Sequence, residues 1–85
     1  FPCYDLALTA AELGDNYPCA LNGSGEIAVH AFLQGRIAFT EIAETMRAAL
    51  EKNERMKADG YAALRETDAR ARAYAEEFVR RKAAK

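Results

Sequence analysis

The stretch Leu21-Asn22-Gly23-Ser24-Gly25-Glu26-Ile27-Ala28-Val29-His30-Ala31-Phe32-Leu33 joins a glycine-containing segment to the densest apolar run in the sequence. Between Ile27 and Leu33 only His30 is polar. A helix that is apolar nearly all round needs neighbours on several sides. We therefore expect this stretch to be the start and body of a central buried helix, capped by Asn22 or Ser24.

A first helix is predicted before this stretch, over Cys3–Leu13. Pro2 suits the first turn of a helix, and Gly14 is expected to end it. Its core-facing residues would be Leu6, Ala10 and Leu13. The residues that follow, Asp15-Asn16-Tyr17-Pro18, are typical of a turn.

A third helix is predicted after the central one. Gly35 is well placed to end the central helix, and Ile37-Ala38-Phe39 reads as a short connector tucked against the core. Thr40 is a suitable N-cap for the third helix. Its spacing predicts an inward stripe of Ile42, Met46, Ala49 and Leu50, with the pairs Arg47–Glu51 and Glu51–Arg55 outside.

The periodicity weakens between Asn53 and Glu66, where Asp59-Gly60 is a predicted break and Tyr61–Leu64 one short helical turn. Thr67 is then the predicted cap of a last helix. Its apolar stripe is Ala71, Tyr74, Ala75, Phe78 and Val79, and its charged ladder is Asp68–Arg72, Arg72–Glu76, Glu76–Arg80 and Glu77–Arg81. If Phe32 and Phe78 are core residues, changing either to Ala costs about 3 to 5 kcal/mol.

These elements predict an all-α fold, a small bundle of about four helices forming a single domain over residues 1–85. The chain has a net charge of -1, but all twelve basic residues lie from Arg36 onward, where nine acidic residues are interleaved with them. A nucleic-acid-binding protein usually has a face with surplus positive charge, so this class is disfavoured. The cluster of Arg70, Arg72, Arg80, Arg81 and Lys82 could contact phosphates, but a salt-bridged, solvated face is the preferred interpretation.

Cys3 and Cys19 do not form a C-x-x-C pair, and we expect free thiols that pack in the core, with a disulfide between them as the alternative. No apolar run is long enough to span a membrane, and no secretory leader is seen. The chain starts at Phe1 without Met, and we expect it to be a piece of a longer polypeptide.

Two local patterns could carry chemistry. His30 lies four residues after Glu26, which permits a metal or acid–base pair, but a useful site needs more converging groups. The preferred interpretation is a partly exposed histidine beside a surface glutamate. Gly23-Ser24-Gly25 could cradle an anion at a helix N-terminus, although an ordinary helix entrance is favoured because no P-loop lysine follows.

A family resemblance covers the chain from end to end. The sequence resembles the C-terminal region of 1-deoxy-D-xylulose 5-phosphate reductoisomerases at three groups of residues. These are Phe1-Pro2-Cys3 with Leu6-Ala7; Leu21-Asn22, Glu26–Val29, Ala31–Leu33, Gly35, Ile37, Phe39, Ile42 and Ala43; and Asp68-Ala69 with Ala71-Arg72. It departs at Gly23-Ser24-Gly25, where the family typically shows Ala-Ala-Asn.

The resemblance implies the C-terminal domain of an enzyme that converts 1-deoxy-D-xylulose 5-phosphate to 2-C-methyl-D-erythritol 4-phosphate in isoprenoid synthesis. It implies NADPH and Mg or Mn as cofactors, a homodimer, and a bacterial cytosolic or plastid location. The motifs for nucleotide, metal and substrate lie upstream in that family, so no catalytic, cofactor-binding or metal-binding residue is expected here. The partner would be the upstream catalytic domain. The alternative is a free-standing helical protein-interaction module with an apolar groove.

Overall fold

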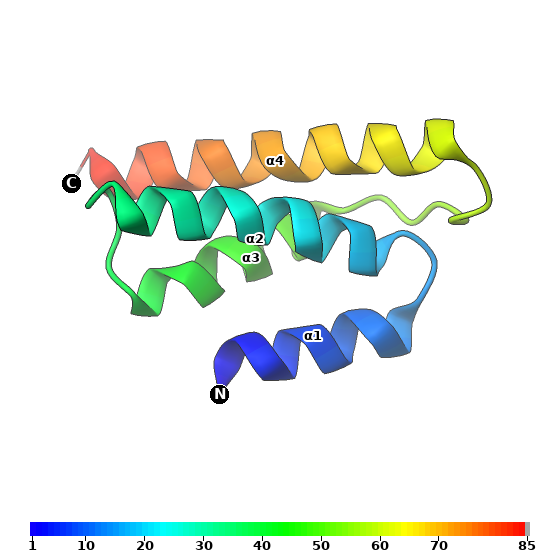
Figure 1. Ribbon diagram of the computed structural model, residues 1–85, viewed down its shortest axis with the longest axis horizontal. Helices are drawn as coiled ribbons and strands as arrows, with labels where there is room; N and C mark the ends of the chain where they lie inside the picture. The colour runs from blue at the N-terminus through cyan, green and yellow to red at the C-terminus, as the bar shows by residue number, and fades with distance from the viewer. Residues whose placement is uncertain (85) are drawn as a thin grey trace.

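The computed structural model describes residues 1–84, and all regular secondary structure in that range is α-helical (Figure 1). The four helices are α1 (Pro2–Leu13), α2 (Tyr17–Leu33), α3 (Thr40–Lys52) and α4 (Tyr61–Ala83). The predicted all-α bundle of four helices is confirmed.

Helix α2 is the centre of the bundle. It contacts α1, α3 and α4, whereas α1 contacts α2 and α3 but not α4 within the described residues. Figure 1 shows α1 along one edge of the molecule and α4 along the opposite edge. The predicted central position of the Leu21–Leu33 stretch is therefore confirmed.

The predicted start of this central helix is wrong, because α2 begins at Tyr17. Pro18 lies in the first turn, where its missing N–H removes no helical hydrogen bond. Ala20 donates its backbone N–H to the Asn16 carbonyl at 3.0 Å, which closes the first turn. The chain reverses earlier, at Gly14 and Asp15, and both have positive φ.

The other end of α2 is closed as predicted by Gly35, which has φ +75°. Arg36 donates its N–H to the Ala31 carbonyl, and Gly35 donates to the Phe32 carbonyl, each at 2.9 Å. This paired arrangement is a Schellman motif, and its left-handed position favours glycine.

The core contains many small side chains. Those on α2 and α4 include Ala20, Ala28 and Ala31, and Ala71, Ala75 and Val79, all at most 2% exposed. Small residues allow helix axes to approach closely, and α2 and α4 share the most extensive contact in the bundle.

The larger predicted core residues are less deeply placed. Leu6 is buried, but Leu13 is 40% exposed because α1 packs through Leu6 and Ala10. Phe32, Tyr74 and Phe78 are half-buried at the edge of the core. The expected loss of about 3 to 5 kcal/mol on truncating Phe32 or Phe78 assumes core burial, and neither side chain meets that condition in full.

The predicted inward stripe of α3 is confirmed, with Ile42, Met46, Ala49 and Leu50 all buried. The predicted capping by Thr40 is wrong, because Thr40 is the first helical residue and no side chain caps the helix. Glu41 Oε1 instead accepts the backbone N–H of Ala38 at 2.7 Å.

The two ends of the Ile37-Ala38-Phe39 connector differ in burial. Ile37 is buried as predicted, but Phe39 is 72% exposed. The Phe39 ring packs edge-on against Phe32, with 5.6 Å between ring centroids. Only the first residue of the connector therefore enters the core.

Helix α4 begins at Tyr61 and includes the region where the sequence predicts only one short turn. The predicted break at Asp59-Gly60 is confirmed, since Gly60 is extended and directly precedes the helix. The predicted capping by Thr67 is wrong, because Thr67 lies inside α4 and is buried. The Thr67 hydroxyl accepts a hydrogen bond from Asn16 instead, so Thr67 makes a tertiary contact rather than a cap.

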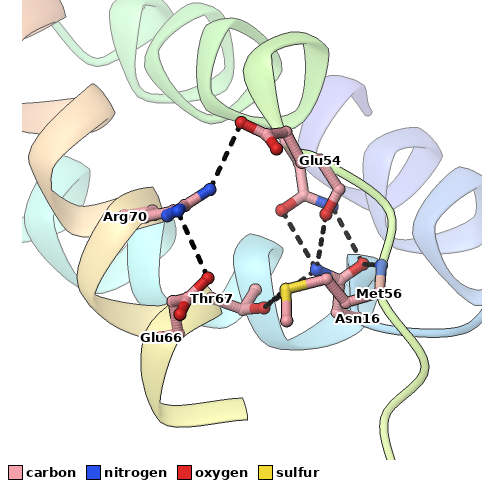
Figure 2. A network of polar contacts seen from close by, with 7 residues as sticks. Asn16, Glu54, Met56, Glu66, Thr67 and Arg70 are labelled. Atoms are coloured by element: carbon pink, nitrogen blue, oxygen red, sulfur yellow. Dashed lines mark hydrogen bonds and ion pairs between the residues drawn. The ribbon is translucent and has the colours of Figure 1, made fainter. Parts of the chain in front are cut away.

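The 53–60 segment connects α3 to α4 without helical structure, and Asn16 holds its first part (Figure 2). The Asn16 side chain is fully buried. Its Nδ2 donates to Thr67 Oγ1 at 2.8 Å and to the Glu54 carbonyl at 2.9 Å. Its Oδ1 accepts from Asn53 Nδ2 and from the Met56 backbone N–H, each at 3.1 Å. One amide thus joins the start of α2 to this segment and to α4.

Arg55 fastens the 53–60 segment to the α1–α2 turn. Its Nη1 donates to the Leu13 carbonyl at 2.9 Å and to Asp15 Oδ2 at 2.7 Å, and its guanidinium lies 5.0 Å from the centroid of the Tyr17 ring. The predicted Glu51–Arg55 helical pair is wrong because α3 ends at Lys52, before Arg55.

The outer face of α4 carries many ion pairs, as the sequence predicts. Two predicted rungs form: Arg72 Nε lies 2.9 Å from Asp68 Oδ2, and Arg81 Nη2 lies 3.3 Å from Glu77 Oε1. Glu76 pairs with Arg36 at 3.8 Å rather than with its predicted neighbours on α4. None of the helices in residues 1–84 combines the length and apolar character that crossing a membrane requires.

Candidate functional site: an apolar groove

A groove of about 780 Å³ lies where α2, α3 and the start of α1 meet. Helix α2 supplies most of its wall, and α3 supplies two buried residues. The apolar side chains that line it are Pro18, Leu21, Val29, Leu33, Ile42 and Met46, and Cys3 lies at the α1 end. These side chains form a concave apolar surface.

The helical repeat explains why α2 presents this wall. Pro18, Val29 and Leu33 project from one side of the helix, while Ala28 and Ala31 project into the core. Gly25 lies on the same side, and a Cβ there would be 3.3 Å from Met46 Cε. The missing side chain lets Met46 reach the groove from α3.

The predictions for Gly23-Ser24-Gly25 are wrong, because these residues lie inside α2. In a helix interior each N–H donates to a carbonyl one turn back, so none is free to bind an anion or to open a helix. Ser24 Oγ donates to the Ala20 carbonyl at 2.8 Å. A Cβ on Gly23 would be 2.6 Å from Asp68 Oδ1, so glycine permits the close approach of α4.

Glu26 and His30 both line the groove and both are exposed. The carboxylate of Glu26 pairs with Arg72 on α4. Arg72 also donates to Asp68, and the hydrogen bonds that Arg72 donates to Glu26 and, to a lesser extent, to Asp68 raise the pKa of the guanidinium. Glu26 therefore acts in an interhelical ion pair, which agrees with a surface role and leaves His30 beside it in solvent.

No three His, Cys, Asp or Glu side chains in residues 1–84 come together in a way that could hold a metal ion. The residues described here therefore do not fit the divalent metal that the resemblance implies for the family.

A family model for the DXP reductoisomerase C-terminal domain matches residues 1–74. The chain belongs to this family. The match includes α1, α2, α3 and the first part of α4, so it covers all three helices that form the groove.

Curated reductoisomerases agree with this assignment. The chain is 43% identical over 79 residues to a 1-deoxy-D-xylulose 5-phosphate reductoisomerase of Heliobacterium modesticaldum, which covers 93% of the chain and 20% of that protein. It is 45% identical over 85 residues to the enzyme of Cupriavidus necator, which covers the whole chain and 22% of that protein. The chain thus spans about a fifth of the length of the curated relatives it matches.

The thiols of this reductoisomerase domain are both free. Core packing is wrong for Cys3, which is exposed, and only partly right for Cys19, which is half-buried. Cys19 Sγ donates to the Leu64 carbonyl at 3.3 Å. Burial raises the pKa of the Cys19 thiol, the charge of Asp68 adds to this, and Arg72 opposes it. A raised pKa disfavours the reactive thiolate.

Four residues of the basic cluster, Arg70, Arg72, Arg81 and Lys82, form ion pairs with carboxylates of this domain, as the salt-bridged interpretation predicts. Arg70 pairs with Glu54 at 3.2 Å and with Glu66 at 3.3 Å (Figure 2). Lys82 lies 3.3 Å from Glu44. These pairs favour the interpretation of a solvated, salt-bridged face over a phosphate-binding one.

Sequence reasoning raised an apolar groove only as part of the alternative function and did not locate its residues, and it missed the Asn16 network. The groove forms only when three helices pack together. Its sequence signal is that Val29 and Leu33 are apolar although they lie outside the part of α2 that faces the core. Asn16 lies in a segment typical of turns, where an asparagine is expected to be exposed.

Proposed function

We propose that this chain is the C-terminal helical domain of a 1-deoxy-D-xylulose 5-phosphate reductoisomerase, which forms 2-C-methyl-D-erythritol 4-phosphate in isoprenoid synthesis. The match of the family model across residues 1–74 carries this proposal. The relatives that cover the whole chain or nearly so support it by name.

The role we propose for the domain is structural. Its conspicuous polar side chains hold parts of the domain together: Asn16 bonds to the 53–60 segment, and Arg72 on α4 pairs with Glu26 on α2 and with Asp68. Catalytic, cofactor-binding and metal-binding residues, together with the NADPH and Mg or Mn they hold, then belong to the upstream part of the enzyme. The full-length enzyme would be a homodimer in the bacterial cytosol or a plastid.

Packing can support catalysis at a distance. A misplacement of about 1 Å in a catalytic group can cost about 100-fold in rate. A helical domain that fixes the position of an adjoining catalytic domain therefore contributes to activity without touching the substrate.

A chimeric enzyme tests this proposal. The segment of the Cupriavidus necator reductoisomerase that matches this chain is replaced by residues 1–85, and a second protein lacks the segment altogether. We expect the chimera to oxidise NADPH within about tenfold of the parent, and the deletion to lose about 100-fold or more.

Two results would contradict the structural role. The deletion protein could keep the parental rate, so that no domain is required. The chimera could fold, as judged by circular dichroism, and yet be no faster than the deletion.

A further inference from the structure

We propose that the groove between α1, α2 and α3 receives an apolar segment of the upstream polypeptide of the same reductoisomerase. This inference rests on the proposed function and adds to it the surface through which the domain attaches. Its occupant is a protein segment that is apolar where it contacts the groove and that belongs to the same molecule.

The wall of the groove on α2 leaves two large apolar side chains exposed. Val29 is 45% exposed and Leu33 is 74% exposed, although both lie on the central helix of the bundle. They share one side of the groove with Pro18 and Leu21, and Ile42 and Met46 lie opposite on α3. Contiguous apolar surface of this kind marks interaction sites.

The charge distribution favours a protein segment. No lysine or arginine lines the groove, and its one carboxylate, Glu26, is already paired with Arg72. The ion pairs gather instead on α4, at the opposite edge from α1 (Figure 1). Interface centres are depleted in charged residues, whereas phosphate ligands require cations.

The position of the groove favours an occupant in the same molecule. About four fifths of the length of the relatives lies outside the matched region. Cys3 lines the groove, so polypeptide joined to residue 1 would enter the domain beside this surface. Tethered segments bind at an effective concentration in the millimolar range, whereas a second copy must also overcome the entropy of association.

Two exposed apolar residues form a matched pair for the test. Val29 in the groove is 45% exposed, and Leu8 on the outer face of α1 is 46% exposed. Val29→Asp and Leu8→Asp are made both in the 85-residue chain and in the Cupriavidus necator chimera. Because both side chains are exposed in the chain, we expect both variants to fold there, with melting temperatures close to that of the unsubstituted chain.

Hydrogen exchange of the α2 amides over residues 26–33 is the direct measurement. We expect these amides to exchange about tenfold more slowly in the chimera than in the chain alone, because docking stabilises the helix. Val29→Asp should remove this protection in the chimera, since it places a charge in an apolar contact. Leu8→Asp should leave it in place.

Three outcomes would overturn the inference. The α2 amides could exchange equally in chain and chimera. Leu8→Asp, rather than Val29→Asp, could remove the protection, which would move the interface to the outer face of α1. Protection in the chain alone could rise with concentration, which would make a second copy the occupant. A fully active chimera with an unprotected groove would refute this inference while leaving the proposed function standing.

Discussion

Asn16 has a fully buried side chain whose amide bonds to two other parts of the chain, the 53–60 segment and α4. No buried side-chain nitrogen or oxygen in the described residues lacks a hydrogen-bond partner. A buried polar network stabilises a fold only while every member is satisfied, because an orphaned donor or acceptor keeps its full desolvation cost. The position of the 53–60 segment therefore depends strongly on one residue.

We predict that Asn16→Ala lowers the free energy of unfolding by about 2 to 3 kcal/mol, because Thr67 and the Met56 N–H lose their buried partner. Asn22→Ala on α2 is the control. Asn22 is exposed, so its replacement should change stability by less than about 0.5 kcal/mol. Urea denaturation measures both, and equal effects would show that the network contributes little.

Residue-level prediction from sequence succeeded where one side chain decides the outcome. Gly35 ends α2 because the next turn requires positive φ, and the glycine is visible in the sequence. Thr40 and Thr67 are predicted to be caps, but Thr40 is the first residue of α3, which has no side-chain cap, and Thr67 lies inside α4 and bonds to Asn16. The bond between Asn16 and Thr67 joins residues that are distant in the sequence, so it leaves no local pattern.

The contact between α2 and α4 is the element-scale feature on which the bundle depends. Ala20, Gly23 and Ala28 on α2 and Ala71 and Ala75 on α4 are buried. The sequence predicted the α4 stripe but not the start of α2, because Pro18 is compatible both with a turn and with the first turn of a helix. Packing of residues 17–20 against the bundle decides between them.

We predict that Ala75→Leu destabilises the domain by about 1 to 3 kcal/mol, since the larger side chain has no room at a fully buried position between helices. The matched control is Ala73→Leu on the same helix, where the side chain is exposed. Thermal unfolding followed by circular dichroism distinguishes the two variants. A stable Ala75→Leu variant would mean that α2 and α4 are more loosely packed than described.

At the scale of the whole molecule, the bundle has two unlike faces. Its α4 face is covered with ion pairs, and the face between α1, α2 and α3 is an apolar groove. The sequence predicted the first, because charged residues on α4 recur at helical spacing. It could not predict the second, because residues from three separate helices form the groove only after they pack.

The central claim is that this domain supplies packing and that the chemistry lies elsewhere in the reductoisomerase. The most direct test is a side-by-side assay of NADPH oxidation by the purified 85-residue chain and by the chimera, each given 1-deoxy-D-xylulose 5-phosphate and Mg²⁺. We predict turnover by the chimera and, from the chain alone, no rate above that of buffer. Saturable turnover by the chain alone would contradict the claim.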